Sequence, residues 1–195
     1  AQGTPFIGLL YVGLALTSTG PKVVEFNVRF GDPETEPLLS LLESPLASIM
    51  LAAAQADLST IDGLRFRPEY AVGVVLASQG YPSAPITGRP ITGLTSQDAD
   101  VLHAGTRLDG DQLVASGGRV LVVLGHGETL AGARQEAYQN LSEIQLDGGF
   151  HRDDIAAAAA EQEALAGLAS GNSSHETPRH ATATPEEPSY RNNPS

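Results

Sequence analysis

Glycine and proline divide this chain into short segments. Its 195 residues include 21 Gly and 13 Pro, and clusters such as Gly80-Tyr81-Pro82 and Gly117-Gly118 interrupt the apolar runs. No run approaches the roughly 20 apolar residues that span a bilayer. With 41% hydrophobic residues, the chain can still bury one ordinary core or two small ones. We therefore expect a globular α+β protein with short strands and helices, and no membrane partner.

Charge and cysteine content exclude several classes of function. The 11 basic and 23 acidic residues give a formal net charge of −12, which would repel a phosphate backbone, so we expect no nucleic-acid partner. The chain has no cysteine, which excludes disulfides, thiolate zinc sites and cysteine nucleophiles. Residues 1–5 resemble no secretory signal. We expect a cytoplasmic protein.

The first 56 residues predict a β-hairpin followed by helices. Two β-rich runs, Phe6 to Leu16 and Lys22 to Phe30, flank a Ser-Thr-Gly-Pro turn. Apolar residues at helical spacing predict a helix near residues 45–56, preceded by a shorter one, with Ser44 as the N-cap and Pro45 at the first helical position. Because the chain opens inside a hairpin, we expect that an N-terminal portion is missing.

The middle of the chain predicts a small antiparallel β domain with one helix. Short β runs occur at Ala71–Ser78, Val101–Ala104 and Arg119–Leu124. Apolar residues at helical spacing between Leu130 and Ile144 mark an amphipathic helix, which Thr129 can cap. An Ala-rich helix is expected over residues 156–169. Residues 170–195 have almost no apolar content and are expected to be disordered.

One strand carries side chains suited to chemistry. Strand periodicity places Glu25, Asn27 and Arg29 on one face and the apolar residues between them on the other. A carboxylate and an amide carbonyl are hard oxygen donors suited to Mg²⁺, and an arginine can bind a phosphate through two parallel hydrogen bonds. Half-exposed strands also carry such residues for solubility, and periodicity alone does not decide between the two interpretations.

The segment from Lys22 to Thr35 resembles the signature of phosphoribosylamine–glycine ligases, which are members of the ATP-grasp superfamily. A Glu-x-Asn pair alone would indicate ATP-grasp enzymes in general, whereas the continuation Arg-Phe-Gly-Asp-Pro-Glu is specific. Further blocks similar to this family follow in the family's order and extend the resemblance over roughly residues 3–155: Gly73 to Pro82, His103 to Thr106, Gly117 to Val120 and Arg152 to Ile155.

The resemblance implies a division of the chain. Residues 1–62 would be the C-terminal part of the ATP-grasp domain, and residues 63–155 would be the family's C-domain. The Ala-rich helix (156–169) and the disordered tail (170–195) would follow. The family's Gly-rich phosphate loop, adenine-binding segment and N-terminal Rossmann-like domain lie upstream of the stretch that this chain contains.

The resemblance also implies a reaction, the ligation of glycine to 5-phosphoribosylamine in de novo purine synthesis. Its products are glycinamide ribonucleotide, ADP and phosphate, with ATP as co-substrate and Mg²⁺ or Mn²⁺ as cofactor. Glu25 and Asn27 match the family's metal ligands. Arg29 matches a motif arginine that we assign as a catalytic residue on the transferring phosphate or acyl phosphate.

Three further residues are expected to bind substrate. Asp32 and Glu34, on the turn that leaves the strand, could bind the glycine ammonium or the amine substrate, although Asp-Pro is also ordinary turn chemistry. Arg119 lies in a motif of the C-domain, as does His103, and both could face a shared cleft. A lone histidine beside Ala-Gly is more often structural.

Two classes of function stay open at this point. The chain could be an enzyme fragment, inactive alone and in its parent fused to or associated with other purine-pathway enzymes. It could instead be a non-catalytic binding or regulatory module, or a truncated gene product, derived from the ligase.

Overall fold

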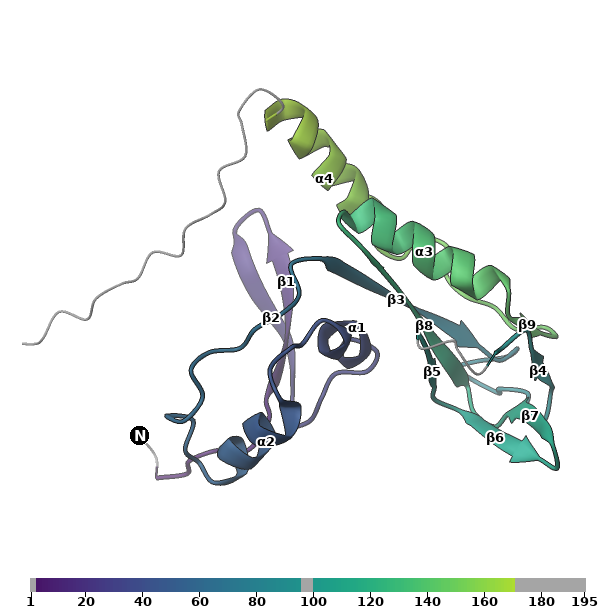
Figure 1. The fold of residues 1–195 in the computed structure, drawn as a ribbon, viewed down its shortest axis with the longest axis horizontal. Coiled ribbons are helices and arrows are strands. Elements are labelled where there is room, and N and C mark those ends of the chain that lie inside the picture. The colour runs from purple at the N-terminus through teal and green to yellow at the C-terminus, as the bar shows by residue number, and fades with distance from the viewer. Residues whose placement is uncertain (1–2, 96–99, 171–195) are drawn as a thin grey trace, which may run out of the picture.

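The computed structural model describes residues 3–95 and 100–170, with an α+β architecture of antiparallel sheets (Figure 1). We call residues 3–69 the N-terminal part and residues 70–170 the C-terminal part. The predicted disordered tail lies almost entirely outside the described residues. Among the described helices, none has the length and apolar content needed to cross a membrane.

The N-terminal part begins with the predicted hairpin. Strand β1 (Tyr11–Thr17) pairs antiparallel with β2 (Gly20–Asn27). Gly20 has a φ of 100°, a left-handed conformation that favours glycine in a tight turn, and the Thr17 hydroxyl donates to its carbonyl at 2.7 Å. The hairpin contributes no side chain to the buried core; Leu16 is 87% exposed. It is therefore a two-stranded ribbon with apolar side chains in solvent.

Two short helices follow the hairpin, α1 (Thr35–Ser40) and α2 (Leu46–Ala54), as the helical spacing predicts. The prediction that Ser44 caps the second helix is wrong. Its hydroxyl accepts a hydrogen bond from the Arg65 backbone N–H at 2.8 Å, and the helix start has no side-chain cap. The cause is tertiary, because the chain that returns at residues 65–67 pairs with residues 41–44, and the Arg65 N–H takes this oxygen.

The C-terminal part is built on a three-stranded antiparallel sheet in the order β3 (Tyr70–Ala77), β8 (Arg119–Gly127), β5 (Val101–His103). This confirms the three predicted β runs. Two smaller antiparallel pairs flank it, namely β4 (Ile91–Thr92) with β9 (Gln145–Leu146), and β6 (Thr106–Asp109) with β7 (Gln112–Ala115).

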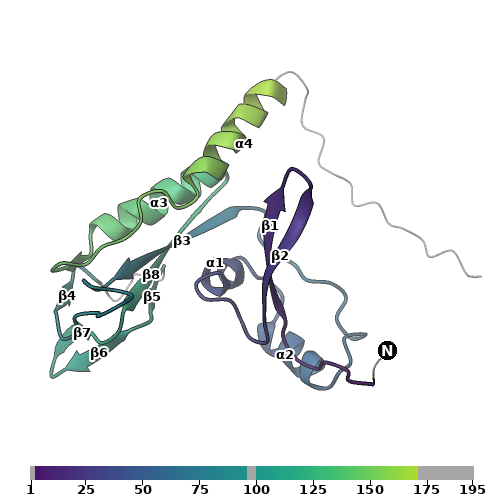
Figure 2. The same cartoon turned by 180° about the vertical axis from the view of Figure 1, so that it is seen from behind.

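Helix α3 (Leu130–Ser142) covers one face of this sheet (Figures 1 and 2). Ala133, Ala137 and Leu141 recur at a spacing of four and are buried against the strands. A side chain on Gly125 of β8 would overlap the backbone of α3, so a glycine lets helix and strand approach closely. The Thr129 side chain accepts from the Gly132 N–H at 3.1 Å, which confirms the predicted cap.

The Ala-rich segment forms the predicted helix, α4 (Ala157–Ser170). Its Glu163 carboxylate accepts from the Leu130 N–H at 2.9 Å and so satisfies a free donor in the first turn of α3. A hydrogen bond with the same carboxylate, together with its charge, raises the pKa of Tyr70. Glu163 therefore ties α4 to the start of both α3 and β3.

Helix α1 packs on the other face of the main sheet. Val72 and Val74 point into the core under α3, so strand alternation directs Gly73 to the opposite face. A Cβ on Gly73 would lie 3.3 Å from Cδ of Pro37 in α1. Helix α1 of the N-terminal part therefore contacts β3 of the C-terminal part at Gly73, where the absence of a side chain leaves room for Pro37.

Candidate functional site

The predicted metal-binding residues lie on β2 in the expected order. Glu25 pairs with Gly13 and Asn27 pairs with Tyr11 across the hairpin. Because the two residues are two apart on one strand, their side chains share a face. A Cβ on Gly13 would lie 3.1 Å from Cγ of Glu25, so the glycine leaves room for that carboxylate to lie over the neighbouring strand.

Arg29 does not continue this row. Strand β2 ends at Asn27, and Arg29 lies in the bend that follows, where its Nη1 donates to the Phe30 carbonyl at 2.7 Å. The prediction that Arg29 shares a strand face with Glu25 and Asn27 is therefore wrong. The hairpin also shifts register, because Gly13 faces Glu25 while Leu14 faces Val23. A periodicity argument assumes one continuous strand and misses both features.

Asp32 and Arg119 meet across 87 positions of sequence. Nη2 of Arg119 lies 2.9 Å from an Asp32 carboxylate oxygen, and Nη1 donates to the Asp32 carbonyl at 3.1 Å. Both side chains remain partly open to solvent, with exposed fractions of 35% for Arg119 and 54% for Asp32. The first residue of β8 thereby holds the loop that leaves β2.

Glu34 is exposed and lies beside Tyr11. The pKa of Tyr11 is raised by its partial burial, then by the charge and hydrogen bond of Glu34, and least by the charge of Glu25. These causes place two carboxylates around one phenol. A hollow of about 140 Å³ is lined here by Tyr11, Gly31 and Glu34. Sequence reasoning missed Tyr11; only the pairing across the hairpin turn, which places it opposite Asn27, could have indicated it.

The residues present fit the magnesium ion that the family signature implies. The fit rests on the donor set of β2, a carboxylate and an amide oxygen on one face, because Mg²⁺ is commonly held by few protein oxygens and completes its shell with phosphate and water. Among the described residues, no group of three or more His, Cys, Asp or Glu side chains could hold a metal by itself. A site of this kind would rely on ligands from a bound nucleotide.

His103 is an exposed residue of β5. Its Nδ1 lies 3.0 Å from the Thr106 hydroxyl at the start of the next strand. This local contact is consistent with the structural interpretation of a lone histidine.

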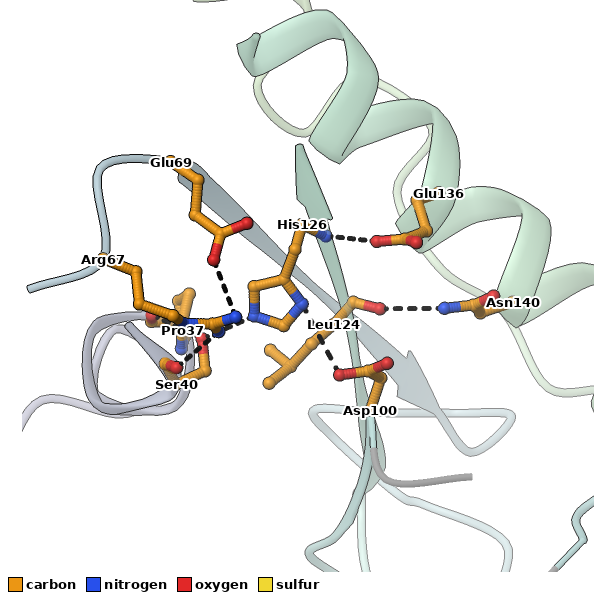
Figure 3. Close-up of polar contacts among 9 residues, drawn as sticks. All are labelled: Pro37, Ser40, Arg67, Glu69, Asp100, Leu124, His126, Glu136 and Asn140. Atoms are coloured by element: carbon orange, nitrogen blue, oxygen red, sulfur yellow. Dashed lines mark hydrogen bonds and ion pairs between the residues drawn. The ribbon is translucent and has the colours of Figure 1, made fainter. Parts of the chain in front are cut away.

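A second polar cluster joins the two parts of the chain (Figure 3). His126, near the end of β8, has Nε2 at 2.9 Å from the Ser40 hydroxyl of α1 and Nδ1 at 3.5 Å from an Asp100 carboxylate oxygen. Arg67 donates to the Ser40 carbonyl at 2.7 Å and pairs with Glu69 at 2.6 Å. Sequence reasoning missed this cluster, because its members are far apart in the chain and match no motif.

The cluster borders a pocket of about 520 Å³ between α1 and the C-terminal part. In its wall, one carboxylate oxygen of Glu36 is buried and has no hydrogen-bond partner among the described residues. The pocket is lined by Thr35, Glu36, Leu39, Ser40, Arg67, Asp100, Leu102, Leu124 and His126.

An apolar groove opens on the N-terminal part. It has a volume of about 340 Å³ and is formed by the chain before β1, α1, α2 and the returning linker. Its lining includes Leu9, Leu42, Met50 and Phe66, and carbon atoms make up almost all of its surface. Met50, one of the lining residues, is 51% exposed, so the groove presents apolar surface to solvent.

Two family sequence models match the chain. Phosphoribosylglycinamide synthetase, C domain, matches residues 71–158, and phosphoribosylglycinamide synthetase, ATP-grasp (A) domain, matches residues 1–35. The Asp32 to Arg119 contact therefore joins the two matched segments.

Curated relatives and a solved structure agree with these matches. The phosphoribosylamine–glycine ligase of Streptomyces coelicolor is 54% identical over 165 residues, which cover 82% of this chain and 40% of that protein. That of Mycobacterium bovis is 53% identical over 161 residues, covering 82% and 38%. The crystal structure of the phosphoribosylamine–glycine ligase from Thermotoga maritima superposes with a TM-score of 0.66 at 38% identity, covering 75% of this chain and 36% of that one. This chain spans about two fifths of the length of the curated relatives it matches.

Proposed function

Because the chain belongs to the phosphoribosylglycinamide synthetase family and carries the end of its ATP-grasp domain and its C domain, we propose that it forms the C-terminal share of an ATP-dependent ligase. The reaction joins glycine to 5-phosphoribosylamine and gives glycinamide ribonucleotide, ADP and phosphate. Its place is the cytoplasm. We divide the chain at residues 62 and 63 into the ATP-grasp end and the C-domain.

The observation that carries this proposal is the contact between Asp32 and Arg119. It brings the family's ATP-grasp signature on β2 together with a motif of the C-domain that lies far away in sequence. Polar residues that served only solubility would not need a partner in the C-domain. Arg119 nevertheless reaches both the carboxylate and the carbonyl of Asp32, in the loop after β2.

In the proposed mechanism, Glu25 and Asn27 would hold Mg²⁺ or Mn²⁺. When bound, the ion neutralises charge on the phosphates of ATP. The protein's own contribution is to fix two oxygen ligands on a paired strand, where backbone hydrogen bonds to β1 hold their spacing. Catalysis of this kind depends on positioning and charge stabilisation.

Arg29 is the proposed catalytic residue. In the structure its guanidinium donates to the adjacent Phe30 carbonyl, a local contact that a phosphate or acyl-phosphate oxygen can replace with a stronger, charge-assisted one. Its place in the bend just after β2 leaves the side chain exposed and free to turn.

Asp32, Glu34 and Arg119 are the proposed substrate-binding residues. Asp32 and Glu34 offer carboxylates to an ammonium or amine group. Arg119 offers a cation to a carboxylate or phosphate group, and in the structure it is paired with Asp32. A substrate that carries both an amine and an anion would supply a partner to each side of this ion pair.

The chain alone is proposed to be inactive. Its hairpin and groove leave apolar side chains in solvent, including Phe26 at 63% and Val24 at 69% exposed, and a folded ATP-grasp domain would cover such surface. The proposed cover is the part of the ligase that precedes this segment in the relatives. Fusion to or association with other purine-pathway enzymes stays a prediction.

A chimera tests the proposal directly. Residues 3–155 of this chain would replace the matching segment of the Streptomyces coelicolor ligase, and ADP release would be measured with and without glycine and 5-phosphoribosylamine. We expect substrate-dependent turnover. Glu25→Gln should reduce it by more than about 100-fold, because changes to outer-shell partners of a metal site alone cost roughly 10–100-fold.

Glu43→Gln is the matched control, since Glu43 is also an exposed carboxylate of the N-terminal part but lies away from β2. It should leave turnover unchanged. A folded chimera without turnover, or a Glu25→Gln variant with full turnover, would refute the assigned role of this segment.

A non-catalytic module is the second candidate. It is favoured by the self-contained core of the C-terminal part, where Val74, Leu121 and Val123 are completely buried without help from the N-terminal part. An inactive chimera, together with a stable, folded C-terminal part, would favour this alternative.

A further inference from the structure

Tyr11 shares a face of the hairpin with the proposed metal ligands. It lies opposite Asn27, and Gly13, two residues further along β1, lies opposite Glu25. Directly paired residues of antiparallel strands project to the same side of the ribbon, and the register shift comes only after Gly13, so all four positions share one face. Because Gly13 has no side chain, the ring of Tyr11 is what β1 contributes to this face.

One edge of this ring lies over Gly13. A Cβ on Gly13 would lie 3.7 Å from Cε1 of Tyr11 and 3.1 Å from Cγ of Glu25. The ring edge and the stem of the Glu25 side chain thus share the space that the glycine leaves open. Tyr11 is therefore next to the strand segment that carries the proposed metal ligands.

The other edge of the ring meets the loop that leaves β2. A Cβ on Gly31 would lie 3.0 Å from Cε2 of Tyr11 and 2.6 Å from Oε2 of Glu34. Gly31 is buried, and its carbonyl accepts a hydrogen bond from the Thr35 hydroxyl at 2.6 Å, which closes the loop. The ring and the Glu34 carboxylate are thus packed together over a second glycine.

The phenol hydroxyl also forms a hydrogen bond with the Glu34 carboxylate. An ionised carboxylate can only accept, so the hydroxyl donates its single proton. This bond uses one lone pair of the carboxylate and leaves others for a further donor, such as an ammonium group. Without the hydroxyl, the exposed Glu34 side chain would be free to adopt other rotamers.

The chemistry of glycine suits this arrangement. Its carboxylate is the group that the proposed reaction activates beside Glu25 and Asn27, and one carbon atom joins that carboxylate to the ammonium group. An acceptor for the ammonium must therefore lie close to the metal-binding face, which is where the Tyr11 ring brings Glu34. The nitrogen of 5-phosphoribosylamine has to attack with a free lone pair, so a carboxylate acceptor suits the glycine ammonium better.

We propose that Tyr11 is a positioning residue that holds the Glu34 carboxylate beside the face of Glu25 and Asn27, where it binds the glycine ammonium. The ring fixes the loop at Gly31, and the hydroxyl fixes the orientation of the carboxylate. This role of Tyr11 rests on the proposed function, and it narrows the ligand of Glu34 to one of the two substrates.

Kinetics of the chimera that contains residues 3–155 test this role. Initial rates of ADP release would be measured while glycine, ATP and 5-phosphoribosylamine are varied in turn. Tyr11→Phe keeps the ring and removes only the hydroxyl. We expect the KM for glycine to rise about tenfold, the lower end of what a hydrogen bond to a charged group contributes. The other two KM values and kcat should change by less than about twofold, because the hydroxyl acts on glycine binding alone.

Two further variants separate positioning from general damage to the fold. Because Tyr11 acts through Glu34, Tyr11→Phe should cause no further rise in the KM for glycine in a chimera that already carries Glu34→Ala. Tyr138→Phe is the matched control. It also removes a hydroxyl that forms a hydrogen bond, to the Arg152 carbonyl at 2.6 Å, but it lies in α3 and should leave every KM unchanged.

The outcomes distinguish this role from the proposed function. In an active chimera, an unchanged KM for glycine in Tyr11→Phe would overturn the role of Tyr11. An equal rise in the KM for ATP or for 5-phosphoribosylamine, or additive effects of Tyr11→Phe and Glu34→Ala, would do the same, and the proposed function would stand. A folded chimera without turnover would instead overturn the proposed function, and the role of Tyr11 with it.

Discussion

The C-terminal part buries its apolar side chains, whereas the N-terminal part exposes them. On β8, Val120, Leu121 and Val123 have no exposed surface, while Leu16 on the hairpin is 87% exposed and Val28, which directly follows β2, is 72% exposed. Both regions are rich in β-branched and aliphatic residues. The difference lies in what covers them: helix α3 lies over the sheet, and no described element lies over the hairpin.

This contrast predicts which region can fold on its own. Burial of apolar surface is the main favourable term in folding, and the C-terminal part obtains it from its own residues. The N-terminal part obtains little, since Ala52 is its only buried apolar residue among those described. Its strands and helices are held by local hydrogen bonds and by contact with the C-terminal part.

The largest effect is expected from truncating the core. Leu121→Ala should lower the free energy of unfolding by about 2–5 kcal/mol, because Leu121 is completely buried and a cavity would remain. The same truncation at Leu16, Leu16→Ala, should change it by less than about 0.5 kcal/mol. Urea unfolding followed by circular dichroism measures both. Equal effects would mean that the hairpin is covered in solution.

A glycine substitution probes the contact between α3 and β8. Gly125→Ala should destabilise the C-terminal part by about 1–3 kcal/mol, because its Cβ would fall on the backbone of Ala133 and Ala137, which cannot move without shifting the helix. Gly167→Ala in α4 is the control. Its Cβ meets nothing within 4 Å, and alanine favours a helix, so it should stabilise slightly. The midpoint of thermal unfolding should therefore fall for Gly125→Ala and rise slightly for Gly167→Ala.

The link between the two parts is expected to be weak. A double-mutant cycle of Arg119→Ala and Asp32→Ala should give a coupling of about 0.2–1 kcal/mol, because both side chains are partly exposed. A cycle of Arg107→Ala and Asp109→Ala is the control. These residues pair at 3.3 Å within the β6–β7 hairpin, so their coupling does not depend on the junction between the two parts. Limited proteolysis of the loop after β2 should accelerate in the first cycle only.

The smallest effect concerns Tyr11. Its raised pKa means that the folded state retains the phenol proton more strongly than the unfolded chain. The associated stability is present below the ordinary tyrosine pKa of about 10 and is lost as pH rises through the folded value. Glu34→Gln should lower the pKa of Tyr11 and leave that of Tyr70, which depends on Glu163, unchanged. Tyrosine ring signals in an NMR titration report both.

Local pattern was sufficient for most elements. Turn residues at Gly20, the cap at Thr129 and the helical spacing from Leu130 onward are short-range signals, and the structure has the elements they predict. Local pattern failed at Ser44 and Arg29. At Ser44 a backbone N–H from residue 65 takes the hydroxyl that would cap a helix, and at Arg29 the strand has already ended.

The sequence by itself determined the family and the order of the signature residues, because these depend on residue identity and spacing along one segment. Only the tertiary structure decided which distant groups meet. Arg119 reaches Asp32, Glu34 turns to Tyr11, and His126 lies between Ser40 and Asp100. The contacts of Arg119 and His126 depend on how α1 packs on the sheet, and the glycine that permits this packing, Gly73, carries no sign of it in the sequence.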